Sequence, residues 1–188
     1  IDQALNNING VDSHVFQNVL TVLPMYHAFA LCVTFIAFRR GLHNILIPSP
    51  RPIDNLRKAF DRYDIHLLPG VNTLFATLLD APWFVQHAPR NLTLCLSGGT
   101  PLKPAVNERW QEVVGNPIYE GYGLTEASPG LTSNPIGHVC KPHSIGVPFA
   151  NTLIRLVNDQ GYCVPPGEAG EIIAQGPQGM QGYWHNDE

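Results

Sequence analysis

Apolar residues recur along most of the chain at the spacing of helices and, between them, in short continuous runs. The clearest helix covers 71–80, where Val71, Leu74, Phe75 and Leu78 follow the i, i+3, i+4, i+7 pattern of an amphipathic helix. Helical patterns also cover 28–40, 53–63 and 106–113; short apolar runs lie at 44–47 and 65–69, and strands are predicted at 92–96 and 117–121. Because helices of this length separate the strands, we expect βαβ units and a parallel sheet.

The pattern changes near residue 135. Residues 145–161 and 167–176 are typical of strands joined by Gly, Pro and Asn-Asp turns, and they show no helical spacing. We therefore predict an α/β fold: part of a doubly wound, mostly parallel sheet with flanking helices in 1–135, followed by the start of a β-rich lobe in 136–188.

The most apolar segment, 28–38, is too short to cross a bilayer as a helix, and we expect it to be a buried core helix. The sequence begins without an initiator methionine or a basic signal-type start, and it ends without a helix stop or a turn. These ends favour an excised part of a longer chain.

Composition excludes some classes of function. Charged residues make up 14% of the chain, against roughly 25% in an average soluble domain, which indicates much interior surface. The net charge is −4 and the 11 Lys and Arg are scattered, so nucleic-acid binding is not expected. The 4 cysteines contain no CxxC pair, and we expect reduced, mostly buried thiols in a cytosolic protein.

Two glycine-bearing loops follow predicted parallel strands, at 97–102 (SGGTPL) and 120–127 (EGYGLTEA). Ligands of open α/β sheets bind at the carboxyl ends of the strands, where glycine lets the backbone approach a ligand closely. The Thr125 hydroxyl can donate to a phosphate oxygen, and the Glu126 carboxylate suits a magnesium ion. Tyr122 offers a flat face to a base. The alternative is a simple helix cap, since Thr followed by an acidic residue also suits a helix N-terminus.

Six motifs in order resemble the central motifs of the acyl-adenylate-forming superfamily, and within it those of bacterial long-chain fatty acid–CoA ligases. They are LPMYHAFAL (23–31), GVNTLFATLL (70–79), SGGTPL (97–102), EGYGLTEAS (120–128), SIGVPFANT (144–152) and PPGEAGEIIAQGPQGMQGYW (165–184). The resemblance runs from about Val19 to the end of the chain. It implies a two-step reaction in which a fatty acid and ATP form an acyl-adenylate, and coenzyme A then displaces AMP.

The resemblance also implies roles for single residues. Glu126 would bind Mg2+ and Thr125 the phosphate of ATP, while Tyr122 would lie against adenine. His27 would face the reacting carboxylate or the thioester channel, although a capping histidine is the alternative. The glycine-rich positions would contact nucleotide and substrate: Gly121 and Gly123 beside the acyl-adenylate; Gly98, Gly99, Thr100 and Pro101 on the adenine side and part of the acyl channel; Gly70 at the acyl tunnel, unless it is an N-cap.

Departures from the family pattern limit what this chain is expected to do alone. We find no phosphate loop in 1–19, no ribose-binding aspartate after GYW, and no C-terminal domain with its catalytic lysine. The chain itself is therefore expected to be inactive. Another acyl- or aryl-activating enzyme of the superfamily and a non-catalytic ligand-binding fragment remain alternatives. We further expect a cytoplasmic protein with peripheral membrane contact and homodimer formation.

Overall fold

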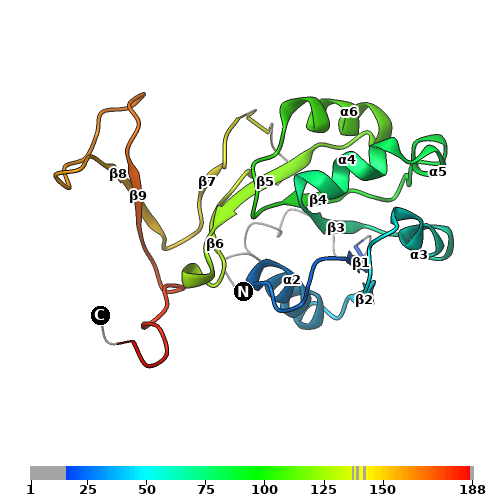
Figure 1. Ribbon diagram of the computed structural model, residues 1–188, viewed down its shortest axis with the longest axis horizontal. Coiled ribbons are helices and arrows are strands. Elements are labelled where there is room, and N and C mark those ends of the chain that lie inside the picture. Colours follow the sequence, from blue (N-terminus) through cyan, green and yellow to red (C-terminus); the bar gives the residue numbers. More distant parts are fainter. Residues whose placement is uncertain (1–15, 137, 139, 142, 187–188) are drawn as a thin grey trace.

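The computed structural model describes residues 16–136, 138, 140–141 and 143–186. In this part of the chain a seven-stranded sheet has the order β2-β1-β3-β4-β5-β6-β7 (Figure 1). Its strands are β1 (Asn18–Thr21), β2 (His43–Leu46), β3 (Leu67–Gly70), β4 (Leu94–Ser97), β5 (Ile118–Gly123), β6 (Gly130–Ser133) and β7 (Val147–Pro148). Strands β1 to β5 pair in parallel, whereas β6 pairs antiparallel with β5 and with β7. The predicted α/β fold with a mostly parallel sheet is confirmed.

The helices lie where the apolar spacing predicted them, with one addition. They are α2 (Ala28–Arg39), α3 (Arg57–Arg62), α4 (Asn72–Asp80), α5 (Pro82–Gln86) and α6 (Pro104–Val114), with short 3-10 turns η1 (Ile53–Leu56) and η2 (Thr125–Ala127). The pattern at 53–63 divides into η1 and α3. Helix α5 was not predicted, and it begins at Pro82, whose fixed φ suits the first position of a helix.

The central strands β3 and β4 are buried on both faces, and neighbouring residues of each strand pack in different cores. Leu67 packs with the cluster under α2, whereas Leu68 packs with the cluster under α3 to α6. Leu94 and Cys95 divide in the same way. Figure 1 shows α2 on one side of the strands and α4 and α6 on the other. This period of two is the expected consequence of a strand buried on both faces.

Three aromatic side chains fill the centre of the larger core. Phe75 of α4 meets Trp110 of α6 edge to face at 5.0 Å between ring centroids, and Phe84 stacks on Trp110 at 5.3 Å. All three are at most 1% exposed. Such pairs contribute roughly 0.5 to 1.5 kcal/mol beyond their buried area, and here they fix three helices against one another.

Helix α2 is only half buried, so the prediction of a buried core helix is wrong for its outer side. Ala30, Val33 and Ala37 face the sheet and are at most 3% exposed. On the outer side, Phe35 is 43% and Phe38 66% exposed. The reason is that α2 alone covers this face of the parallel strands, and no described helix packs on its second side.

Beyond β7 the chain forms a hairpin that stands apart from the helices (Figure 1). Strands β8 (Leu153–Val157) and β9 (Glu171–Gln175) pair antiparallel, as the strand patterns in 145–161 and 167–176 predicted. The division of the chain at 135 stays a prediction, since β6 and β7 continue the main sheet on either side of it. No helix among the described residues has the length and apolar character needed to span a membrane.

The four cysteines are free, but they are less buried than predicted. Cys95 is buried, Cys32 and Cys140 are half-buried, and Cys163 is exposed on the hairpin. Cys95 lies on β4 beneath Trp110, and burial raises the pKa of its thiol well above the usual range. Burial also raises the pKa of Cys32 and of Cys140. Their thiolate fractions at a given pH are therefore lowered.

We expect a thiol reagent at pH 8 to separate these cysteines by rate. The thiolate is the reactive form, so a buried thiol with a raised pKa reacts slowly. In the native protein Cys163 should be labelled first and Cys95 only after denaturation, as mass spectrometry of labelled peptides would show. Cys163→Ser should remove the fast phase. Fast labelling of Cys95 in the native protein would contradict this packing of β4.

Candidate active site

A cavity of about 400 Å³ opens at the carboxyl ends of β4 and β5. Its walls come from α2, from the SGG turn after β4, and from β5 with the turn that follows it. Eight residues for which the sequence predicts a role at the site line this cavity: His27, Gly98, Gly99, Gly121, Tyr122, Gly123, Thr125 and Glu126. The structure thus brings together segments separated by almost a hundred positions in the sequence.

One wall of the cavity is apolar. Phe29, Val33 and Ile36 of α2 and Leu96 of β4 line this wall. They belong to, or pack against, the core cluster between α2 and the sheet, so the wall is an extension of that core. An apolar wall that deepens into the core can receive an alkyl or aryl group of a ligand.

The SGG turn forms the floor of the cavity beside α2. The Gly98 N–H donates to the Gly70 carbonyl at 3.4 Å, and Gly99 adopts φ +78°. Ser97, at the end of β4, is 2% exposed, and its hydroxyl has no hydrogen-bond partner among the described residues. An unpaired buried hydroxyl costs free energy, so a polar group of a ligand is a favourable partner. The sequence alone does not single out Ser97, because the neighbouring glycines dominate the pattern of this turn.

Strand β5 changes its pairing at the cavity, which corrects the prediction of a loop over 120–127. Glu120 still pairs in parallel with β4, but Gly121 to Gly123 pair antiparallel with β6, with a bulge between Tyr122 and Gly123. A Cβ on Gly123 would overlap the Pro129 carbonyl oxygen. Glycine is therefore required here by the approach of two strands, independently of any ligand.

Thr125 and Glu126 occupy the short η2 turn that follows β5. The N-cap of η2 is Leu124, and no side chain caps the turn, so the alternative that Thr125 is a helix cap is not what the structure has. Ser128 closes the turn at φ 51°, in the left-handed region that a residue with a side chain rarely adopts. The turn holds the hydroxyl and the carboxylate on the cavity wall opposite α2.

The Glu126 carboxylate has a partner that sequence reasoning missed. The Tyr183 hydroxyl donates to Glu126 Oε1 at 2.6 Å. This hydrogen bond lowers the pKa of Glu126, with a smaller contribution from its own backbone, and it raises the pKa of Tyr183. Glu126 is therefore held in its ionised form. No local sequence pattern predicts this contact, because it joins positions 57 residues apart.

His27 caps α2 and also faces the cavity. Its Nδ1 accepts from the Phe29 N–H at 3.3 Å, so the capping alternative is present in the structure. The Cε1 and Nε2 atoms of the same ring come within 3.9 Å of the position that a Cβ on Gly99 would take. The ring therefore lies between the start of α2 and the SGG turn, and one edge can meet a ligand while the other caps the helix.

Three predicted site residues are not among those that line the cavity: Gly70, Thr100 and Pro101. Gly70 is the last residue of β3, and a Cβ there would meet the Phe75 ring at 2.8 Å, so this position faces the helix layer. The N-cap of α4 is Val71, which also removes the capping alternative for Gly70. Thr100 and Pro101 lie exposed beyond the SGG turn.

No group of three or more His, Cys, Asp and Glu side chains among the described residues could hold a metal ion. Glu126 is therefore a single hard oxygen ligand. A magnesium ion at Glu126 would take its remaining ligands from water or from a bound phosphate, as magnesium in nucleotide sites commonly does.

Comparison with known proteins decides the family. The family model described as AMP-binding enzyme matches residues 2–184. This chain belongs to the AMP-binding enzyme family. It is 44% identical over 169 residues to the long-chain-fatty-acid–CoA ligase of Salmonella typhimurium and 42% identical over 167 residues to that of Escherichia coli O6:H1. Each match covers 88% of this chain and 30% of the relative, so the chain spans about a third of the length of these proteins.

Solved structures of the family share the fold. The crystal structure of the anthranilate CoA ligase AuaEII in complex with anthranoyl-AMP matches with a TM-score of 0.85 and 26% sequence identity. The match covers 98% of this chain and 37% of that protein. The sheet with its two helical layers is thus the arrangement of an AMP-binding enzyme.

Two substitutions of His27 separate capping from a role at the cavity. His27→Asn retains a side chain that caps helices well, whereas His27→Ala loses the cap, which costs roughly 0.5 to 2 kcal/mol. If the ring contacts substrate, both variants of the full-length enzyme should lose turnover, and only His27→Ala should melt several degrees lower. Steady-state kinetics and thermal unfolding measure the two effects. Normal turnover of His27→Asn would leave His27 a purely structural cap.

Proposed function

We propose that this chain is the central part of an ATP-dependent long-chain fatty acid–CoA ligase. The carboxylate oxygen of the acid would attack the α-phosphorus of ATP, the bond to the β-phosphate would break, and pyrophosphate would leave. The thiol of coenzyme A would then lose its proton and attack the acyl carbon, and AMP would leave with the bonding electrons. Membership of the AMP-binding family and the names of the bacterial relatives support this reaction.

The observation that carries the proposal is the two-sided cavity. Its apolar wall comes from α2 and the end of β4, while Thr125 and Glu126 stand on the wall opposite. An alkyl chain against Phe29, Val33 and Ile36 would leave its carboxylate near the polar wall, where the phosphates of ATP would also lie. The volume of about 400 Å³ lies within the range of small-molecule sites.

The residues on the polar wall have separate tasks. Thr125 would donate its hydroxyl to a phosphate oxygen, and Tyr122 would stack on adenine, with Gly98 and Gly99 allowing close approach. The ionised Glu126 fits a magnesium ion, which would neutralise charge on the phosphates when bound. Attack at phosphorus leaves little covalent work to the protein, so holding the reactants in line is the main contribution of these residues.

The buried Ser97 hydroxyl adds an expectation about the substrate. It lacks a partner in the protein and lines the cavity between the apolar wall and the SGG turn. A bound acyl-adenylate would supply the polar atom that this hydroxyl lacks. The finding supports a ligand with a polar group at the end of β4 and an apolar group against α2.

A second candidate is activation of an aromatic acid. The solved structure of an anthranilate CoA ligase with anthranoyl-AMP has nearly the same fold as this chain. The aromatic side chain Phe29, together with Ile36 and Leu96, can pack against a planar ring as well as against an alkyl chain. The polar wall would act in the same way on either acid.

ATP–pyrophosphate exchange by the full-length enzyme tests the proposed function. A panel of acids from acetate to oleate, with benzoate and anthranilate, should give the highest kcat/KM with long-chain fatty acids, because each buried methylene adds about 0.8 kcal/mol of binding. A maximum with the aromatic acids would favour the second candidate. No exchange with any acid would end both.

Glu126→Ala should lower the exchange rate on the order of a hundredfold or more, because it removes the one carboxylate that faces the phosphates. Glu168→Ala is the matched control, since Glu168 is exposed on the turn before β9 and belongs to no wall of the cavity. Circular dichroism checks that both variants are folded. An unchanged exchange rate of Glu126→Ala at saturating magnesium would contradict the assignment.

A further inference from the structure

The segment after β9 lies against the turn that carries Glu126. The Met180 N–H donates to the Glu126 carbonyl at 2.8 Å, so the two backbones are joined directly. Two residues earlier in the same segment, Gln178 Nε2 donates to the Gly130 carbonyl at 3.2 Å and to the Thr152 hydroxyl at 2.9 Å. Figure 1 shows this segment passing η2 on its way from the hairpin to the end of the chain.

Glu126 is thereby held at both its backbone and its side chain. Its carbonyl accepts from Met180, and its carboxylate Oε1 accepts from the Tyr183 hydroxyl at 2.6 Å. A hydrogen bond from a phenol to a carboxylate at this distance is charge-assisted and among the stronger kinds. A glutamate on a short turn has three rotatable side-chain bonds, and a fixed partner reduces the orientations that its carboxylate samples.

The two side chains come from segments that lie far apart in the sequence. Glu126 follows β5 of the main sheet, whereas Tyr183 lies beyond the hairpin, 57 positions later. Tyr183 is 57% exposed, so packing in a core does not account for its place. Its hydroxyl meets the one carboxylate that the proposed function needs.

We propose that Tyr183 is a positioning residue for Glu126, and that its hydroxyl orients the carboxylate toward the magnesium ion that accompanies ATP. The inference rests on the proposed function, which assigns the metal to Glu126. With Oε1 engaged by Tyr183, the second carboxylate oxygen of Glu126 would be the one left for the metal. Partners of this kind orient a metal ligand without touching the metal, and their loss commonly weakens metal binding tenfold or more.

The test measures how much magnesium strengthens ATP binding by the full-length enzyme. Calorimetry gives the Kd of ATP in EDTA and at saturating magnesium, and the ratio of the two is the metal-dependent gain. Tyr183→Phe removes only the hydroxyl, and it should reduce this gain on the order of tenfold while leaving the Kd in EDTA unchanged. In the Glu126→Gln background the same substitution should have no further effect on the gain.

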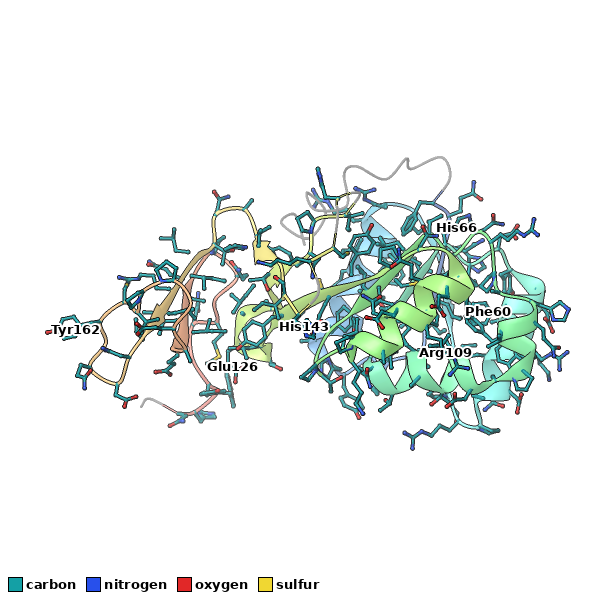
Figure 2. The ribbon with its side chains drawn as sticks, turned by 90° about the horizontal axis from the view of Figure 1, so that it is seen from above. Phe60, His66, Arg109, Glu126, His143 and Tyr162 are labelled. Atoms are coloured by element: carbon teal, nitrogen blue, oxygen red, sulfur yellow. The ribbon has the colours of Figure 1, made fainter. Side chains whose placement is uncertain are left out.

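Tyr162→Phe is the matched control. Figure 2 shows Tyr162 at the far end of the hairpin, while Glu126 lies between the hairpin and the helical body. Tyr162 is 72% exposed, and its substitution should leave both Kd values at those of the wild type. An unchanged gain in Tyr183→Phe would overturn the inference, as would an equal weakening of ATP binding with and without magnesium, which marks a structural role. Absence of pyrophosphate exchange in the wild type would instead reject the proposed function, whatever the two Kd values show.

Discussion

The close approach of Gly123 to Pro129 sets the path of the chain along one side of the cavity. Because a Cβ on residue 123 would overlap the Pro129 carbonyl oxygen, β5 can fold back along β6 only if residue 123 has no side chain. That fold-back turns the chain from a parallel to an antiparallel partner and leaves the η2 turn beside the end of β4. The placement of a hydroxyl and a carboxylate opposite an apolar helix therefore follows from the packing of two strands.

The SGG turn and helix α2 complete this arrangement from the other side. The backbone of Gly98 is tied to the end of β3, and the His27 ring closes the gap between the start of α2 and Gly99. The strands behind these elements are buried on both faces and support them from two cores. Preorganised polar groups beside an apolar wall suit a reaction that depends on holding its reactants in line.

The sequence predicted the elements with a strong local signal and missed those whose signal is tertiary. Helix α4 was clear because Leu74, Phe75 and Leu78 recur at helical spacing. Strand β1 lies beside the edge strand β2 and gives no clear signal, because only two of its four residues (NVLT) are apolar and they do not alternate with the polar ones. The sequence predicts a loop where β5 folds back, since glycines at a strand end also indicate turns.

The same distinction holds at the candidate site. The order of the six motifs identified the Thr125 and Glu126 turn, and the cavity brings most of the predicted residues together. The sequence predicts Gly70 at the acyl tunnel, but a glycine before a helix does not indicate which neighbours surround it. In the structure its open side faces the Phe75 ring. Ser97 and Tyr183 could not be predicted, since an unpaired hydroxyl and a bond across 57 positions exist only in the folded chain.

The alternation of Leu67 and Leu68 between two cores has a consequence for how such a protein can vary. An insertion of one residue within β3 would move the side chains that follow it to the opposite face of the sheet, where they would pack in the wrong core. Such a change would be strongly destabilising, so the length of the strand can vary little. The turns beyond the strand ends carry no such penalty. Residues at the rim of the cavity can therefore be exchanged while the layers that support them stay the same.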